Sequence, residues 1–119
     1  MAARPIVHVE FSTADPKVSG KFFAEMFGWK LTHSEEMNYT MFDTENGLGG
    51  GFPATDENSK PGDVLVYIDS KDIDADLARI TAAGGQVLVP KMEIPNTGWF
   101  AIFADPVGTR AALYTGMQQ

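Results

Sequence analysis

The strongest constraint on the fold is that one order of sequence patterns occurs twice along the chain. A strand-like stretch, an amphipathic helical stretch and three more strand-like stretches are followed by a loop and then by the same five patterns. Landmarks of the two halves lie 57 residues apart: Asp15 and Asp72 before the helices, Gly28 and Gly85 after them. This order predicts two βαβββ modules.

Local signals place the elements of these modules. We expect a first helix between Asp15, a helix-capping residue followed by Pro16, and Gly28, which suits a helix end. A second helix over residues 72–83 carries Ile73, Leu77 and Ile80 on one face. The expected strands are residues 6–11, 29–32, 38–44, 64–68, 86–89, 99–104 and 111–114. A tight turn is expected at 105–108.

The glycine-rich stretch 47–52 is ambiguous in the sequence. It is compatible with a flexible loop, or with an edge strand that a ligand or another backbone approaches closely. Both interpretations are therefore open.

Composition limits the class of protein. The 119 residues suit a single domain over 1–119, with modules at about 5–52 and 63–115. There is no cysteine, which excludes disulfides, thiolate metal sites and a cysteine nucleophile. The net charge of −7 and the lack of a basic cluster argue against nucleic-acid binding. No apolar run reaches the roughly 20 residues of a membrane span, and no signal-peptide core is visible, so we expect a cytoplasmic protein.

The predicted fold class is α+β. Two βαβββ modules are expected to form curved mixed sheets around a shared cleft, with one helix on the outer face of each.

The ordered set of motifs resembles the vicinal oxygen chelate superfamily, which contains glyoxalases, bleomycin-resistance proteins and extradiol dioxygenases. The matching stretches are His8-Val9-Glu10-Phe11 with Asp15-Pro16, Phe22-Phe23 with Phe27-Gly28-Trp29, Tyr67 with Asp72-Ile73-Asp74 and Gly84-Gly85, and Asp105-Pro106-Val107-Gly108. The resemblance covers nearly the whole chain and is to small single-domain members. It implies a pocket for a small molecule and a homodimer.

The resemblance also implies where a metal would be held: in the first and last strands of each module. Of these positions only His8 carries a donor, because Leu65, Ala112 and the stretch 49–52 carry none. We therefore expect neither a metal site nor a cofactor. A rebuilt site of His8, Glu10 and Asp63 is an open alternative, and His33 is expected at the surface.

The same positions indicate a ligand site. The candidates are His8, Glu10, Leu65, Tyr67, Trp99, Ala112 and Tyr114. The strand at 38–44 adds either Tyr39, Met41 and Asp43 or Thr40, Phe42 and Thr44, since its facing is undetermined. The small residues at 49–51 and 112 are expected to leave volume in the cleft. Tyr67 and Trp99 have an alternative role as core or dimer contacts.

Three functions follow as hypotheses. The first is a metal-free protein that binds an apolar or aromatic ligand. The second is a lyase, isomerase or dioxygenase that uses His8 as acid or base, with a rebuilt or absent metal site. The third is a structural or regulatory module, for which the sequence contains no positive sign.

Overall fold

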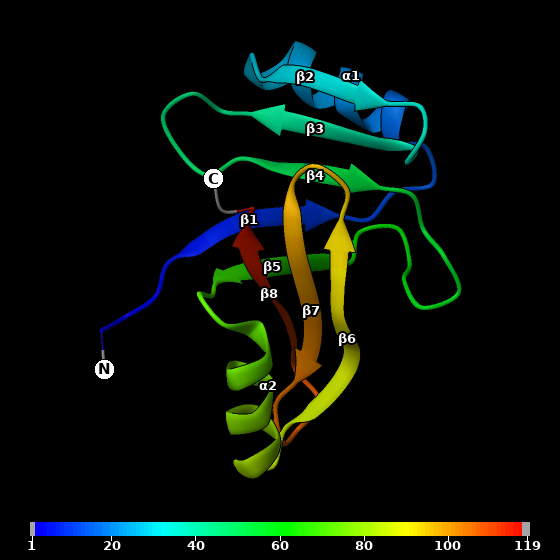
Figure 1. Ribbon diagram of the computed structural model, residues 1–119. Helices are drawn as coiled ribbons and strands as arrows, with labels where there is room; N and C mark the ends of the chain where they lie inside the picture. The colour runs from blue at the N-terminus through cyan, green and yellow to red at the C-terminus, as the bar shows by residue number, and fades with distance from the viewer. Residues whose placement is uncertain (1, 118–119) are drawn as a thin grey trace. The chain divides into compact units, whose positions relative to one another are not determined.

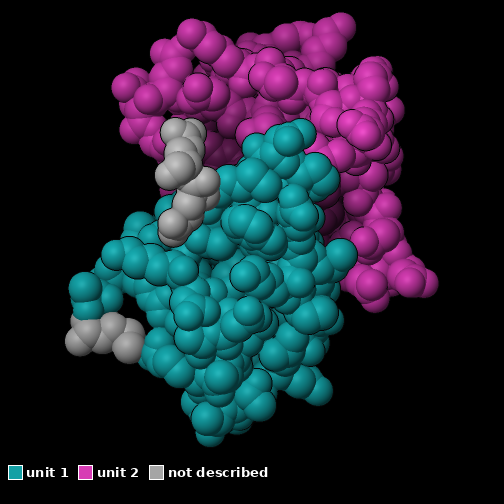
Figure 2. All heavy atoms as spheres, viewed as in Figure 1, with its two compact units in different colours: residues 1–7, 66–119 teal, residues 8–65 magenta. Residues whose placement is uncertain are grey.

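The computed structural model describes residues 2–117 and divides into two compact units (Figure 2). Unit 1 consists of residues 1–7 and 66–119, and unit 2 of residues 8–65. The elements along the chain are β1 (Ile6–Phe11), α1 (Pro16–Phe27), β2 (Lys30–Ser34), β3 (Tyr39–Asp43), β4 (Gly50–Pro53), β5 (Val64–Asp69), α2 (Ile73–Ala82), β6 (Gln86–Ile94), β7 (Gly98–Ala104) and β8 (Arg110–Gly116). This order confirms the predicted α+β class with two βαβββ modules.

In unit 2, four strands lie in the order β2-β3-β4-β1, with α1 packed on β2, β3 and β4 (Figure 1). β2, β3 and β4 pair antiparallel, whereas β4 and β1 pair parallel. The core between helix and sheet is aromatic, formed by Phe11, Phe23, Trp29, Phe42 and Phe52. Trp29 and Phe42 stack with ring centroids 4.3 Å apart, and Phe52 is 1% exposed. These large rings anchor α1 to one face of the sheet and leave the other face uncovered by the helix.

Both ends of α1 match the sequence prediction. The Asp15 carboxylate accepts a hydrogen bond from the Val18 amide at 3.3 Å, and Pro16 starts the helix. Gly28 ends it with a φ of 75°, and its amide donates to the carbonyl of Ala24. Asp72 caps α2 in the same way, through the Ala75 amide.

In unit 1, four strands lie in the order β5-β8-β7-β6, with α2 against β6, β7 and β8 (Figure 1). β5 and β8 are parallel, and the other pairs are antiparallel. The core beneath α2 contains Ile73, Leu77, Ala101 and Leu113. β6 is longer than predicted and runs through Pro90 to Ile94, with register shifts between Val87 and Met92. Because β6 is an edge strand of this unit's sheet, the missing amide of Pro90 interrupts no second ladder.

The glycine-rich stretch 47–52 is divided: residues 47–49 lie outside the strands, and residues 50–52 belong to β4, which is not at an edge. β4 lies between β3 and β1, so neither a flexible loop nor an edge strand describes residues 50–53. A side chain at Gly50 would collide with the Val9 carbonyl and with Phe42. The glycine is therefore required by the close approach of β1.

Two further details complete the fold. His33 is not the surface residue that was predicted: its side chain is 18% exposed, and its Nδ1 lies 2.6 Å from the Thr40 hydroxyl. Neither α1 nor α2 has the length and apolar character needed to cross a lipid bilayer.

Candidate functional site

The face of the unit 2 sheet opposite α1, which we call the open face, carries a hydrogen-bonded chain of three side chains. The Tyr39 hydroxyl donates to Glu10 Oε2 at 2.7 Å and lies 2.7 Å from His8 Nε2. A tyrosine hydroxyl has a single proton, and here that proton points to Glu10. His8 must therefore carry its proton on Nε2 and donate it to the Tyr39 oxygen. The chain runs from imidazole through phenol to carboxylate.

Strand alternation explains why these groups share a face. Phe11 of β1 packs in the aromatic core under α1, so His8 and Glu10 point to the opposite face. On β3, Thr40 and Phe42 are buried on the helix side at 2% and 5% exposure. This places Tyr39 on the open face and settles the facing that the sequence left undetermined.

A glycine allows Tyr39 to reach β1. β4 lies between β3 and β1, and Gly51 pairs with Met41 on one side and Glu10 on the other. A Cβ added at Gly51 would overlap the ring and hydroxyl of Tyr39. The phenol thus crosses β4 in the space that glycine leaves. The expectation that residues 49–51 leave open volume is wrong at Gly50 and Gly51, where protein atoms fill the space.

The hydrogen-bonded side chains of His8, Tyr39 and Glu10 are partly buried, and this burial sets the protonation state of His8. The side chains of His8 and Glu10 are 26% and 15% exposed, and His8 Nε2 lies 3.9 Å from Glu10 Oε2. Burial lowers the pKa of His8 below its ordinary value of 6.5, so the ring is neutral at pH 7. A neutral imidazole coupled to a carboxylate can orient a polar ligand group or take part in proton transfer.

His8 and Glu10 are potential metal donors on this face. Within residues 2–117, no group of three or more histidine and carboxylate side chains is placed to hold an ion. His8 Nε2 and Glu10 Oε2 are 3.9 Å apart, and Asp63 Oδ2 accepts the Lys60 amide at 2.9 Å within a turn. Leu65 and Ala112, at two of the positions that the resemblance marks as metal-holding, have no donor atom.

Unit 1 has an open face of its own, opposite α2. Tyr67 pairs with Ala112, and its ring lies 6.5 Å from that of Phe100. Tyr67 is 7% exposed and Ala112 is fully buried. Tyr114, two residues along β8, shares this face and donates to the Thr97 carbonyl at 3.4 Å. Three of the predicted site residues are thus brought together here.

Trp99 and Leu65 are placed differently. Trp99 packs against the core beneath α2, and the Lys91 ammonium lies 5.4 Å from its ring centroid. Trp99 alternates with Phe100 along β7 and points to the helix side, which supports the alternative role of Trp99 as a core contact. Leu65 lies half-buried in β5, within unit 2.

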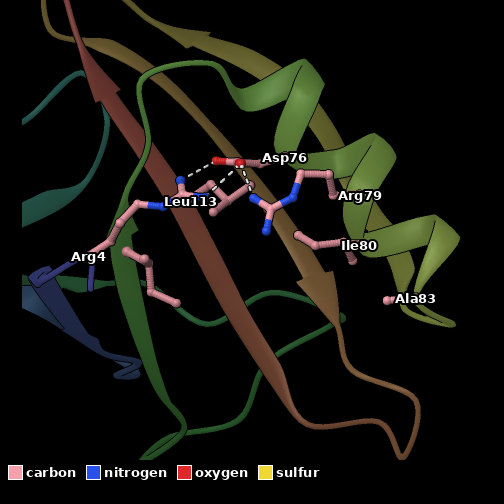
Figure 3. A pocket seen from close by; sticks show the side chains of 7 residues that line it. Arg4, Asp76, Arg79, Ile80, Ala83 and Leu113 are labelled. Carbon is pink, nitrogen blue, oxygen red and sulfur yellow. Dashed lines mark hydrogen bonds and ion pairs between the residues drawn. The ribbon is translucent and has the colours of Figure 1, made fainter. Parts of the chain in front are cut away.

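A cavity of about 290 Å³ lies on the α2 side of unit 1 (Figure 3). Its lining residues are Arg4, Ile68, Asp76, Arg79, Ile80, Ala83 and Leu113. Asp76 is 7% exposed and accepts hydrogen bonds from Arg4 at 2.5 and 2.8 Å and from the Ser70 hydroxyl at 2.6 Å. These bonds, Arg4 foremost, lower the pKa of Asp76 to about 2. The ion pair fastens the segment before β1 to α2, so we assign Asp76 a structural role.

The sequence did not single out Tyr39 as a site residue. It also did not indicate that Arg4 and Asp76 form an ion pair. Tyr39 appeared only as one of two alternative sets on its strand. Asp76 could have been noticed, because it lies on the helix face defined by Ile73, Leu77 and Ile80, where a carboxylate needs a partner. Nothing in the sequence indicates that this partner is Arg4.

Comparison with known proteins agrees with this architecture. Crystal structures of methylmalonyl-CoA epimerase from Mycobacterium tuberculosis (16% identity, 99% of this chain and 93% of that one, TM-score 0.78) and of a superfamily member from Vibrio splendidus 12B01 (16%, 94% and 98%, TM-score 0.67) share the fold. Anthracycline biosynthesis protein DnrV of Streptomyces peucetius is 27% identical over 122 residues, which cover 88% of this chain and 44% of DnrV. The chain thus matches less than half the length of that relative.

A family model gives the decisive match. The model of the Glyoxalase/Bleomycin resistance protein/Dioxygenase superfamily matches residues 5–113, which include the first βαβββ module and the second as far as Leu113 in β8. The chain therefore belongs to the Glyoxalase/Bleomycin resistance protein/Dioxygenase superfamily.

Proposed function

We propose that this protein binds a small apolar or aromatic molecule on the open faces of its sheets without using a metal ion. The observation that carries the proposal is the chemistry of the open faces. His8, which stands at a metal-ligand position of the family, is hydrogen-bonded in a chain with Tyr39 and Glu10. Two of the other metal-ligand positions carry Leu65 and Ala112.

The side chains on these faces suit such a ligand. Tyr67 and Phe100 bring aromatic rings to this face of unit 1, where Tyr67 is 7% exposed, and Met41 of β3, which is 48% exposed, offers an adaptable apolar contact in unit 2. The His8–Tyr39–Glu10 chain supplies a few oriented polar groups. Apolar surface with a small number of placed polar groups is typical of small-molecule sites.

Metal analysis tests one half of the proposal. Protein purified without chelator is expected to contain no stoichiometric zinc, nickel, iron or manganese by inductively coupled plasma mass spectrometry. A content near one ion per chain that is lost in His8→Ala would overturn the metal-free assignment.

A ligand screen tests the other half. Phenols, naphthols and aromatic acids are screened by thermal shift, and hits are titrated by calorimetry against the wild type and Tyr67→Ala. Tyr67→Ala should weaken binding by about 1–3 kcal/mol, the value of a large aromatic contact. The control is Phe27→Ala, which removes an aromatic ring that is 62% exposed on α1 and should leave affinity unchanged. Equal affinity in wild type and Tyr67→Ala would contradict the assignment.

The His8–Tyr39–Glu10 chain favours a second candidate, a proton-transfer enzyme. Neutral His8 would act as the base at a carbon next to a carbonyl group, with Tyr39 and Glu10 holding its orientation. Methylmalonyl-CoA, named for a protein of the same fold, is a suitable probe. Protein-dependent deuterium exchange into this probe that is lost in His8→Gln would establish catalysis, and no exchange would exclude this substrate.

A further inference from the structure

The cavity on the α2 side of unit 1 has an apolar part and a charged part (Figure 3). Its apolar walls come from three elements: Ile68 of β5, Ile80 and Ala83 at α2, and Leu113 of β8. Its charged lining consists of Arg4, Asp76 and Arg79. Apolar walls with a few placed charged groups are typical of a small-molecule site.

The fold explains why space is left at this position. α2 packs against β6, β7 and β8, whereas β5 is the first strand in this unit's order, beyond β8. Residues 76, 80 and 83 follow one another at spacings of four and three, so they line one side of the helix. Ile68 and Leu113 are register partners on β5 and β8 and face the same core as α2. The cavity therefore lies between one side of α2 and the strands next to it.

The charged lining has more positive than negative charge. Asp76 Oδ1 accepts hydrogen bonds from Arg4 Nη2 at 2.8 Å and from Arg79 Nη1 at 3.3 Å. Asp76 Oδ2 accepts hydrogen bonds from Arg4 Nη1 and from the Ser70 hydroxyl. Each carboxylate oxygen thus accepts two hydrogen bonds, while two guanidinium groups and one carboxylate give the lining a net charge of +1. The Asp69 carboxylate helps to raise the pKa of Arg4, which keeps this guanidinium charged, and it is not part of the lining.

The two arginines favour a ligand with a negative charge. A guanidinium has five N–H donors in one plane, and this plane matches the two oxygens of a carboxylate. Arg4 uses Nη1 and Nη2 for its bonds to Asp76 and to the Asp69 carbonyl. Arg79, whose side chain is 56% exposed, brings a second guanidinium to the lining. Because the Asp76 oxygens already accept four bonds, a ligand that enters the cavity meets donors and positive charge.

The size of the cavity limits the rest of the ligand. A volume of about 290 Å³ is at the small end for ligand pockets and equals about ten water molecules at roughly 30 Å³ each, so it suits a molecule of about ten non-hydrogen atoms. A net charge of +1 matches a monoanion, and the isoleucine and leucine walls suit an apolar body. A small monocarboxylate with an apolar body has both properties.

We propose that this cavity binds a small organic monocarboxylate, with the carboxylate at the two arginines and the apolar body against the isoleucine and leucine walls. Asp76 holds the guanidinium groups in place through its hydrogen bonds. For a ligand of this size we expect a dissociation constant of about 0.1–1 mM. The proposal does not depend on the function proposed above, because the cavity lies on the helix side of the sheet and Tyr67 lies on the open face.

Titration with phenylacetate, a monocarboxylate of this size, tests the proposal. The readout is the backbone amide spectrum of the ¹⁵N-labelled protein at up to about 10 mM ligand. The amide signals of Ile68, Ile80 and Leu113 should shift and saturate together. Phenylacetamide has the same shape without the charge, and it should bind about tenfold more weakly because it loses the charge-assisted bonds to the arginines.

Three variants test the charged and the apolar part of the cavity. Arg79→Gln should weaken phenylacetate binding about tenfold and leave phenylacetamide binding unchanged, because it removes one of the two cations. Ala83→Leu should abolish the binding of both compounds, since it fills the cavity at a position whose φ of −90° suits any residue. Arg110→Gln makes the same change of residue and charge at an exposed arginine of β8 outside the lining. This control should bind phenylacetate like the wild type, and circular dichroism checks that each variant folds.

Tyr67→Ala separates this cavity from the open face of unit 1. Phenylacetate binding should be unchanged in this variant. Loss of binding in Tyr67→Ala with retention in Arg79→Gln would place the carboxylate on the open face and overturn the proposal. An absence of shifts at the three amides up to about 10 mM, or equal affinity of the wild type, Arg79→Gln and Ala83→Leu for phenylacetate, would also overturn it.

Discussion

Gly51→Ala is the substitution that most directly tests how the open face of unit 2 is built. The φ of Gly51 lies outside the left-handed region, so alanine fits the backbone. The three atoms nearest to a Cβ at this position all belong to Tyr39. The methyl group must therefore push the phenol out of the space over β4.

The cost follows from the bonds that the displaced phenol gives up. Tyr39 would lose its bond from His8 and its bond to the Glu10 carboxylate. A neutral hydrogen bond contributes about 1 kcal/mol and one to a charged group about 1.5–3 kcal/mol, giving a loss of about 2–4 kcal/mol. Replacing glycine by alanine returns about 0.5–1 kcal/mol by restricting the unfolded chain. The net destabilisation should be about 1–3 kcal/mol.

A double-mutant cycle isolates this cause. The free energy of unfolding is measured by urea denaturation for the wild type, Gly51→Ala, Tyr39→Ala and the double variant. In the Tyr39→Ala background the phenol no longer occupies the space next to residue 51, so Gly51→Ala should be neutral or slightly stabilising. The coupling energy between the two substitutions should be about 2 kcal/mol. Gly47→Ala is the control, because its Cβ would meet Thr44 Oγ1 at an ordinary 3.4 Å. Equal costs of Gly51→Ala in both backgrounds would refute the crossing of Tyr39 over β4.

Three further predictions concern the ionisable groups. Asp76→Asn should destabilise the protein by about 2–4 kcal/mol in urea unfolding, because it breaks the pair between Arg4 and the buried Asp76 carboxylate, whereas Asp74→Asn, at a side chain that is 73% exposed, should change stability by less than about 0.5 kcal/mol. The pKa of Asp76 is about 2 in the folded protein and ordinarily 3.8, so Asp76 contributes stability above pH 4, and about 2 kcal/mol should be lost as the pH falls from 4 to 2. The same dependence of the unfolding free energy on acid pH in the wild type and in Asp76→Asn would contradict this. Because the pKa of His8 is lowered in the folded protein, its contribution to stability is complete above pH 6.5 and declines as the pH falls below that value. Thermal unfolding followed by circular dichroism should show this decline for the wild type and not for His8→Gln.

Much of the secondary structure was predictable because its signals are local. The span 6–11 of β1, the caps of α1 and the tight turn after β7 depend on residues that are neighbours in sequence. Prediction from the sequence failed where the structure of a segment depends on pairing with another strand. The sequence did not indicate the length of β6, which follows from its pairing with β7, or the interior position of β4, which follows from strands on both sides.

The same division applies to the candidate site. Alternation along β1 was sufficient to place His8 and Glu10 on one face. On β3, both alternating sets contain an aromatic residue and a polar one, so only the packing of Phe42 under α1 decided that Tyr39 faces the other way. For Trp99 the sequence left a ligand role and a core role open, because a tryptophan near a strand end suits either face until the helix core is known.

The sequence by itself determined the repeated βαβββ order, the helix caps and the shortage of metal donors, since these depend on residue type and short-range spacing. Only the tertiary structure decided that the space left by Gly51 is filled by Tyr39, and that His8, Tyr39 and Glu10 form one hydrogen-bonded chain. The physical reason is that a glycine specifies only the absence of a side chain. What occupies that space depends on which strands lie next to each other, and the residues that pair β1 with β4 are 41 positions apart in the sequence, as Glu10 and Gly51 are.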